Sequence, residues 1–135
     1  MSEKNLRLEI VTPQKKVFSE DVSFLVAPGT DGELGILPEH APLITSLNIG
    51  ILRIEQEGKK FKVVVSGGFM EVRNNKTTVL ATSAERAEEI DVVRAEAAKR
   101  RAEERLSTKT PDLDTLRAEL ALRRALTRLK AASDG

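Results

Sequence analysis

Turn-forming residues are concentrated in the first part of the chain, and this asymmetry constrains the fold more than any other feature of the sequence. Seven of the eight glycines and four of the five prolines precede residue 69 in a chain of 135 residues. Because Gly and Pro mark chain reversals, the first part is expected to turn often. From Ser83 onward Ala, Glu, Arg and Leu dominate, and these are strong helix formers. The sequence therefore predicts two domains, residues 1–84 and residues 85–135.

Short runs of alternating apolar residues before residue 83 have the period of half-buried strands. The clearest runs are Leu6, Leu8 and Ile10; Val22, Phe24 and Val26; Leu52 and Ile54; Phe61, Val63 and Val65; and Val79 and Ala81. Turn residues at 28–29, 57–58, 67–68 and 74–75 separate these runs. The predicted fold class is α+β: an N-terminal antiparallel β-sandwich or barrel followed by a C-terminal antiparallel two-helix hairpin.

Two helices are expected, from about Ile90 to Leu106 and from about Asp112 to Leu129, with Pro111 and Asp112 forming the start of the second. Their short connection predicts an antiparallel hairpin. In the first helix the alanines at 95, 98 and 102 share one face, which permits close approach but buries little apolar area.

The leucines of the second helix divide between two nearly opposite faces, 113, 116 and 120 on one and 122, 126 and 129 on the other. One interpretation is a helix with two apolar partners, or one that exchanges partners between two states. The alternative is an irregularly packed helix with some exposed leucine.

Charged residues at the helix ends form the strongest candidate site. Arg117, Arg124 and Arg128 lie within about 40° of one another around the second helix. Asp91 and Arg94 begin the first helix, where backbone N–H groups favour anions, and the hairpin brings them level with Arg124 and Arg128. Two hypotheses follow: an Asp91–arginine ion pair that fastens the hairpin, or a phosphate-bearing ligand held by guanidinium groups.

The single histidine lies in GELGILPEHAPLI, residues 32–44, between Pro38 and Pro42, which stiffen the loop. A catalytic role would need Glu39 or Glu33 to orient His40 as a general base. The loop contains no recognisable nucleophile and no oxyanion site, which argues against catalysis. Two readings remain, a turn-capping His40 and a stiff docking surface that loses little entropy on binding.

Composition excludes several classes of protein. The net charge is +1, and all of the 3% aromatic residues are Phe, which argues against nucleic-acid binding. With no cysteine and one histidine, no disulfide, thiolate or protein-only metal site is expected. No apolar run is long enough for a membrane span, and the N-terminus lacks a signal-peptide core.

Three segments in register resemble the ε subunit of F-type ATP synthase. They are GELGILPEHAPLI, SGGFMEV at 66–72, and AERAEEIDVVRAEAAKRRAEERL at 84–106. The resemblance implies a non-catalytic rotor subunit of the central stalk, coupling rotation to ATP synthesis at the cytoplasmic face of the bacterial plasma membrane. Membrane association would be indirect, through the complex, and no nucleic acid would be bound.

The resemblance also assigns partners to residues. The sandwich would grip the γ subunit, and Glu33 and His40 would face the loops of the c-ring. The hairpin would permit turnover when folded and block ATP hydrolysis when extended into the catalytic α/β head. There the basic residues of the second helix would meet acidic segments of the β subunits; they are Arg117, Arg123, Arg124 and Arg128.

Some bacterial members of this family bind ATP through the motif Ile/Leu-Asp-x-x-Arg-Ala. The matching residues here are Ile90, Asp91, Arg94 and Ala95, with Glu85 upstream and Arg124 and Arg128 in the second helix. This favours ATP as a regulatory ligand; no cofactor is required, and the sequence makes no prediction for magnesium.

The alternatives from other classes are a free-standing adaptor or RNA-binding module with a basic helical arm, and an enzyme centred on His40. The SerThrLysThr stretch before Pro111 departs from the family pattern and bears on how readily the hairpin opens.

Overall fold

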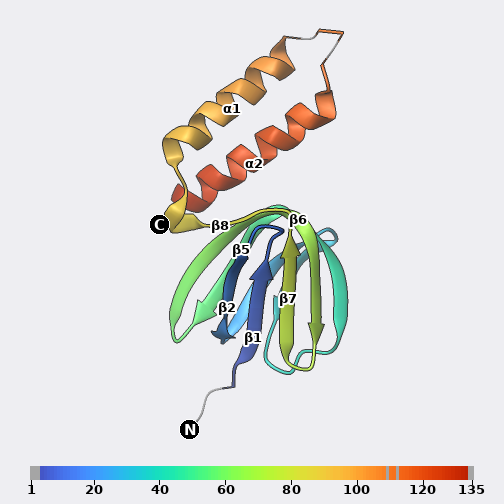
Figure 1. Ribbon diagram of the computed structural model, residues 1–135, viewed down its shortest axis with the longest axis vertical. Helices are drawn as coiled ribbons and strands as arrows, with labels where there is room; N and C mark the ends of the chain where they lie inside the picture. Colours follow the sequence, from blue (N-terminus) through green and yellow to red (C-terminus); the bar gives the residue numbers. More distant parts are fainter. Residues whose placement is uncertain (1–3, 109, 112, 134–135) are drawn as a thin grey trace. The chain divides into compact units, whose positions relative to one another are not determined.

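The computed structural model describes residues 4–108, 110–111 and 113–133, and the chain divides into two compact units, residues 1–86 and 87–135 (Figure 1). The first unit contains all the strands. They are β1 (Leu6–Val11), β2 (Lys16–Val22), β3 (Phe24–Gly29), β4 (Gly32–Ile36), β5 (Leu43–Gln56), β6 (Lys59–Arg73), β7 (Lys76–Ala81) and β8 (Ala84–Arg86). The second contains η1 (Ala87–Glu89), α1 (Val92–Ser107) and α2 (Thr115–Ser133).

Two long strands, β5 and β6, run through both layers of the sandwich, curving from one into the other (Figure 1). The first layer joins β2, β1 and β7 to residues 68–73 of β6 and 43–47 of β5. The second layer joins β8 to residues 59–66 of β6, 49–56 of β5, and then β3 and β4. This is the predicted β-sandwich, with one exception to the antiparallel rule. β1 and β7 are parallel, which their large separation in the chain allows because no tight turn joins them.

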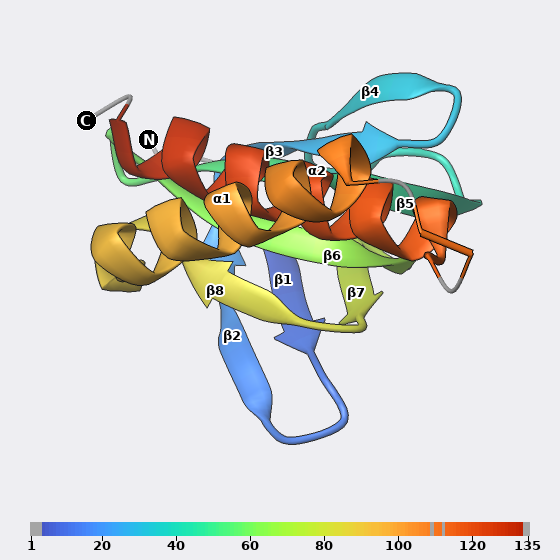
Figure 2. The same cartoon turned by 90° about the horizontal axis from the view of Figure 1, so that it is seen from above.

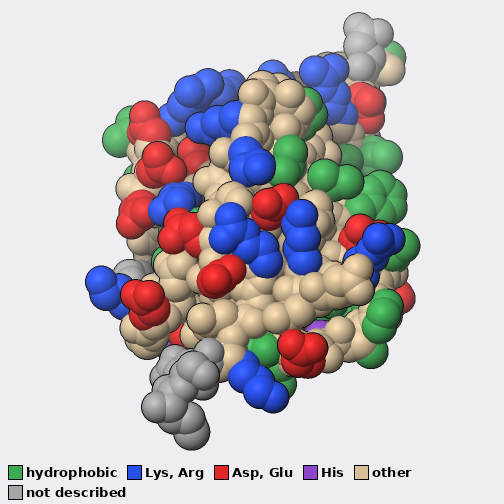
Figure 3. Space-filling model, turned by 60° about the horizontal axis from the view of Figure 1, so that its bottom comes forward, with side chains coloured by type: hydrophobic (Ala, Val, Ile, Leu, Met, Phe, Trp, Pro, Cys, Tyr) green, Lys and Arg blue, Asp and Glu red, His purple; other side chains and the backbone are tan. Residues whose placement is uncertain are grey.

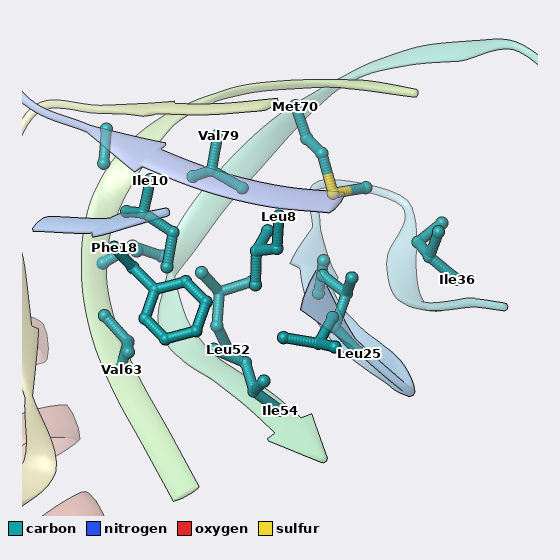
Figure 4. Packing of buried hydrophobic residues seen from close by; sticks show 14 of the residues in the cluster. Leu8, Ile10, Phe18, Leu25, Ile36, Leu52, Ile54, Val63, Met70 and Val79 are labelled. Carbon is teal, nitrogen blue, oxygen red and sulfur yellow. The ribbon is translucent and has the colours of Figure 1, made fainter. Parts of the chain in front are cut away.

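The core lies between the two layers and draws side chains from both (Figure 4). Leu8 and Ile10 of β1 meet Leu52 of β5 and Val63 of β6, all of them without exposed surface. Each fully buried aliphatic side chain stabilises the fold by about 1.5–3 kcal/mol relative to an exposed one. The sandwich therefore has a core of its own.

The predicted turn at Gly67-Gly68 is wrong, because both glycines lie inside β6 at the point where the strand changes layers. Their φ angles are +87° and +133°. A Cβ on Gly68 would lie 2.1 Å from the carbonyl oxygen of Leu80, so only glycine fits there. The glycine pair thus allows the strand to bend rather than to reverse.

A second correction concerns the phase of the run Val22, Phe24 and Val26. The chain bends at Ser23, whose N–H donates to the carbonyl of Glu55 over 2.8 Å. After the bend Leu25 and Ala27 are buried and Phe24 and Val26 are not, so the run belongs to two strands. The turn expected at residues 28–29 lies at Thr30-Asp31 instead, whereas those at 57–58 and 74–75 are confirmed.

Both helices begin later than predicted, because an aspartate caps each of them. The Asp91 carboxylate accepts from the N–H of Arg94 over 3.1 Å, and α1 begins at Val92. The Asp114 carboxylate accepts from the N–H of Arg117 over 3.0 Å, and α2 begins at Thr115. The start predicted at Asp112 lies outside the described residues.

One buried hydroxyl in the sandwich lacks a partner, and it allows a test of the core. Thr77 has no exposed surface, and its Oγ1 makes no hydrogen bond. We expect Thr77→Val to raise the free energy of unfolding by about 1 kcal/mol, because a buried unsatisfied hydroxyl costs more than a methyl group of the same shape. Chemical denaturation measures this, with the half-buried Thr78→Val as a control expected to change stability by less than about 0.5 kcal/mol. A destabilised Thr77→Val would show that the hydroxyl is satisfied in solution.

Candidate functional site

The two helices of the hairpin pack against each other through buried alanines, a contact that we call the alanine seam. This seam sets the register of the candidate anion site. Ala95 and Ala102 of α1 and Ala118 and Ala125 of α2 are buried. The spacing is seven residues in both helices, so antiparallel packing places Ala95 level with Ala125 and Ala102 level with Ala118. Figures 1 and 2 both show the start of α1 beside the end of α2, as this register requires. Ala98, predicted on the same face, is half-buried.

The leucines of α2 flank the seam instead of forming it. Leu116 is 65% exposed and Leu126 is 44% exposed, while Leu113 and Leu120 are half-buried. Alanine contacts bury little apolar area, so the hairpin itself is held weakly. Exposed leucine on a weakly held helix leaves apolar surface for another partner.

Arginines precede buried alanines at matching positions of the two helices. Arg94 precedes Ala95 and Arg124 precedes Ala125, and in an antiparallel pair this offset puts both arginines on the same side of the seam. Arg128 lies one turn beyond Arg124, toward the capped start of α1. This register therefore places Arg94, Arg124 and Arg128 on one side of the seam, at the open end of the hairpin.

Asp91 caps α1, and in the described part of the chain it forms no ion pair with Arg94 or Arg124. In the described part of the chain its carboxylate accepts only from the N–H of Arg94, and the guanidinium groups of Arg94 and Arg124 form no ion pair. The contacts of Arg94 and Arg124 thus give the fastening hypothesis no support, and for Arg128, which has an interaction of its own, it stays a prediction. Unpaired arginines beside a helix start are a suitable arrangement for a polyanion.

The remaining motif residues are placed as follows. Ile90 is buried at 9% exposure, its N–H donating to the carbonyl of Ala87, and Ala95 has no exposed surface, so both shape the site through packing. Glu85 belongs to the other unit, where it lies in β8 opposite Val64 of β6. Sequence reasoning missed Arg101, which precedes Ala102 and so lies on the same side of the seam; the heptad repeat of alanine was the signal that could have found it.

A separate open hollow of about 310 Å³ lies at the turn end of the hairpin. Its lining residues are Arg101, Glu104, Arg105, Thr108, Thr110 and Leu113. None of these lining residues belongs to the motif at the open end of the hairpin, so the hollow is not the predicted nucleotide site.

The histidine loop spans residues 37–42 between β4 and β5, and His40 is visible in purple in Figure 3. The His40 Nδ1 lies 2.7 Å from the carbonyl oxygen of Ala41, so this nitrogen carries the proton and donates. A carbonyl thus occupies the position that a catalytic carboxylate would need, and neither Glu33 nor Glu39 hydrogen-bonds the ring. Glu33 is exposed on β4. The structure contradicts the general-base arrangement and leaves both residues available to a partner.

An apolar stripe crosses the outer face of the first layer; we define it as Val11, Ile44, Phe69 and Leu80. Strand register sets Val11 opposite Leu80 and Leu80 opposite Phe69. Phe69 is 59% exposed, Leu80 55% and Ile44 72%. Sequence reasoning missed this surface, although Phe69 directly precedes the buried Met70 on β6 and so occupies an outward position where a polar residue is usual.

Polar residues border the apolar stripe on β1 and β2. The Ser19 hydroxyl donates to the Glu9 carboxylate over 3.1 Å and holds the pKa of Glu9 below its ordinary value, with smaller contributions from Lys76 and Lys16. A contiguous apolar surface with a charged border is typical of a protein–protein interface.

In the described part of the chain, no group of acidic or histidine side chains is arranged to hold a metal ion, and no helix is long and apolar enough to cross a membrane.

Comparison with known proteins accounts for both units. Residues 5–87 match the β-sandwich domain of the ATP synthase delta/epsilon chain, and residues 88–133 match its long α-helix domain. The ATP synthase epsilon chain of Pelotomaculum thermopropionicum is 83% identical over 110 residues, covering 82% of each chain. That of Carboxydothermus hydrogenoformans is 67% identical over 127 residues, covering 94% of this chain and 95% of the relative.

A solved structure agrees with these relatives. A chain in the Euglena gracilis mitochondrial ATP synthase matches with a TM-score of 0.82 at 27% identity, over 98% of this chain and 82% of that one. The fold and the comparisons define a two-domain subunit of the delta/epsilon class. Within that class the chain belongs to the bacterial ATP synthase epsilon chains, non-catalytic subunits of the central stalk of the F-type enzyme. Family membership replaces the alternatives of an adaptor, an RNA-binding module and a His40 enzyme.

Proposed function

We propose that this subunit couples rotation to ATP synthesis through its sandwich and inhibits ATP hydrolysis through its hairpin, with ATP as a regulatory ligand. The observation that carries the regulatory part is the alanine seam, with Arg94 and Arg124 at its open end forming no ion pair in the described part of the chain. A polyanion that bridges the two helices stabilises the folded hairpin, and it biases the switch only as far as it binds that state better than the extended one.

The nucleotide contacts are proposed from the family motif and the seam register. Arg94, Arg124 and Arg128 supply positive charge for phosphate oxygens, while Asp91 holds the start of α1 in helical geometry. Ile90 and Ala95 shape the site by packing, and the seventh motif-associated residue, Glu85, lies on β8. ATP bound here is a ligand, because the chain has no glycine-rich phosphate loop that would assemble a hydrolytic site.

The extended hairpin is proposed to reach the catalytic α/β head. Arg117, Arg123 and Arg124 are exposed and, in the described part of the chain, form no ion pairs, so they are available to acidic segments of the β subunits. Arg128 completes this basic surface. Because Arg124 and Arg128 also serve the nucleotide site, ATP and the β subunits compete for the same side chains.

The sandwich is proposed to bind the γ subunit through the apolar stripe and the c-ring through Glu33 and His40. These contacts hold the subunit at the cytoplasmic face of the plasma membrane, as a peripheral part of the complex. The exposed aromatic ring of Phe69 at the centre of the apolar stripe supports this assignment, since buried aromatic anchors dominate many interfaces.

Phe69→Glu tests the γ interface. We expect it to weaken binding of the full chain to γ at least about tenfold, because a carboxylate would be buried against apolar surface without a partner. Calorimetric titration with γ measures the affinity. Lys60→Glu, an exposed change on the same strand in the second layer, is the control and is expected to leave the affinity within about twofold. Equal affinities for the parent chain and Phe69→Glu would remove the apolar stripe from the interface.

A further inference from the structure

One side chain ties the histidine loop to two other segments of the sandwich. The Asn75 Oδ1 accepts from the N–H of Glu39 over 2.8 Å, although the two residues are 36 positions apart in the chain. The Asn75 Nδ2 donates to the carbonyl of Asn5 over 2.9 Å. Because both ends of the amide have a partner of the opposite kind, its orientation is fixed.

The backbone of Asn75 is fixed as well. Asn74 and Asn75 form the β6–β7 turn with φ angles of +52° and +57°, a left-handed pair typical of tight hairpin turns. The carbonyl of Asn75 accepts from the N–H of Arg7 over 3.1 Å. The side-chain amide of Asn75 is therefore held rigidly, and it connects the β6–β7 turn to the histidine loop.

The hydrogen bond from the loop to Asn75 is made by Glu39, a residue whose backbone conformation needs support. Glu39 has a φ of +64°, an uncommon conformation for a residue with a Cβ. This conformation lets the N–H of His40 turn back to the carbonyl of Leu37 over 3.1 Å, and the imidazole then donates to Ala41. The Nε2 of His40 is left as the ring nitrogen that can bond to a partner.

We propose that Asn75 is a positioning residue for docking: it holds Glu39 in the left-handed conformation and so fixes how the loop presents His40. This inference rests on the proposed docking function of the loop. Asn75 itself lies outside the loop, in the β6–β7 turn.

The asparagine pair offers a matched test of the positioning part. Asn75→Gly keeps a left-handed backbone accessible and removes both hydrogen bonds of the side-chain amide. Asn74→Gly makes the same change one position earlier, where the side chain forms no hydrogen bond in the described part of the chain. We expect amide hydrogen exchange of Glu39 and His40 to be at least about tenfold faster in Asn75→Gly and unchanged in Asn74→Gly. Equal exchange in the two variants would overturn the positioning role.

Docking is read in the assembled ATP synthase with a photoactivatable probe on Leu37→Cys, the only thiol in this subunit. The side chain of Leu37 is 63% exposed, and its carbonyl bond to His40 is kept. We expect crosslinking to the c-ring, with a yield several-fold lower in Asn75→Gly than in Asn74→Gly.

The outcomes separate the two claims. An undiminished yield in Asn75→Gly would overturn the positioning role while the docking function stands. Absence of a c-ring crosslink in the probe-bearing Leu37→Cys subunit with both asparagines intact would overturn the docking function and, with it, the role of Asn75 in docking. A lower yield that tracks the faster exchange would support both.

Discussion

Removal of residues 87–135 is expected to raise ATP hydrolysis by the assembled complex about tenfold. If the extended hairpin holds roughly 90% of complexes in the blocked state, its loss releases that fraction at once. Truncation after Arg86 is the informative boundary, because β8 remains paired with β6 and the sandwich keeps its whole core. The measurement is steady-state ATP hydrolysis by membranes or purified enzyme containing the truncated subunit.

The rate of ATP synthesis separates loss of the brake from a general defect of the complex. The Arg86 guanidinium lies 5.4 Å from the Phe18 ring centroid and 5.9 Å from that of Phe61, a cation–π contact that anchors β8 and should survive truncation. Proton-driven ATP synthesis should therefore persist, since the sandwich still joins the rotor. Hydrolysis that stays at the parent rate while synthesis is retained would place the brake outside the hairpin.

The period of the sequence predicted the β-sandwich well, but it did not predict where strands bend. Leu6, Leu8 and Ile10 were assigned to the core correctly because a straight strand keeps one phase from end to end. The phase is lost at Ser23, where a single residue without an apolar side chain turns the chain between layers. Gly67 and Gly68 likewise allow both a turn and a bend, and only the neighbouring carbonyl of Leu80 shows which one occurs.

In the candidate sites, too, contacts between neighbours in the sequence could be predicted, whereas contacts between distant residues could not. Asp91 and Arg94 were found from their spacing within one helix, since a cap and its helix are adjacent in sequence. The bond from Glu39 to Asn75 joins residues far apart in the chain, so no local pattern could indicate it. The apolar stripe likewise depends on the pairing of four strands, β1, β7, β6 and β5.

Arg124→Ala is expected to weaken ATP binding by the isolated full chain by about tenfold to a hundredfold. A charge-assisted hydrogen bond contributes roughly 1.5–3 kcal/mol, and Arg124 has no competing ion pair in the described part of the chain that would reduce this loss. Titration of ATP, followed by calorimetry and by the amide signals of Asp91 and Arg94, measures the change.

Arg123→Ala is the matched control, since it removes the same charge from the adjacent position. Arg123 precedes Ala125 by two residues and so projects about 160° away from the seam, whereas Arg124 lies beside it. We expect Arg123→Ala to leave ATP affinity within about threefold and yet to weaken inhibition of hydrolysis, because only the β-subunit contact uses its side chain. If both variants lose ATP binding equally, general charge attraction holds the nucleotide, and the seam has no specific site. If neither loses it, the nucleotide binds elsewhere, and the regulatory bias must come from the exposed leucines of α2.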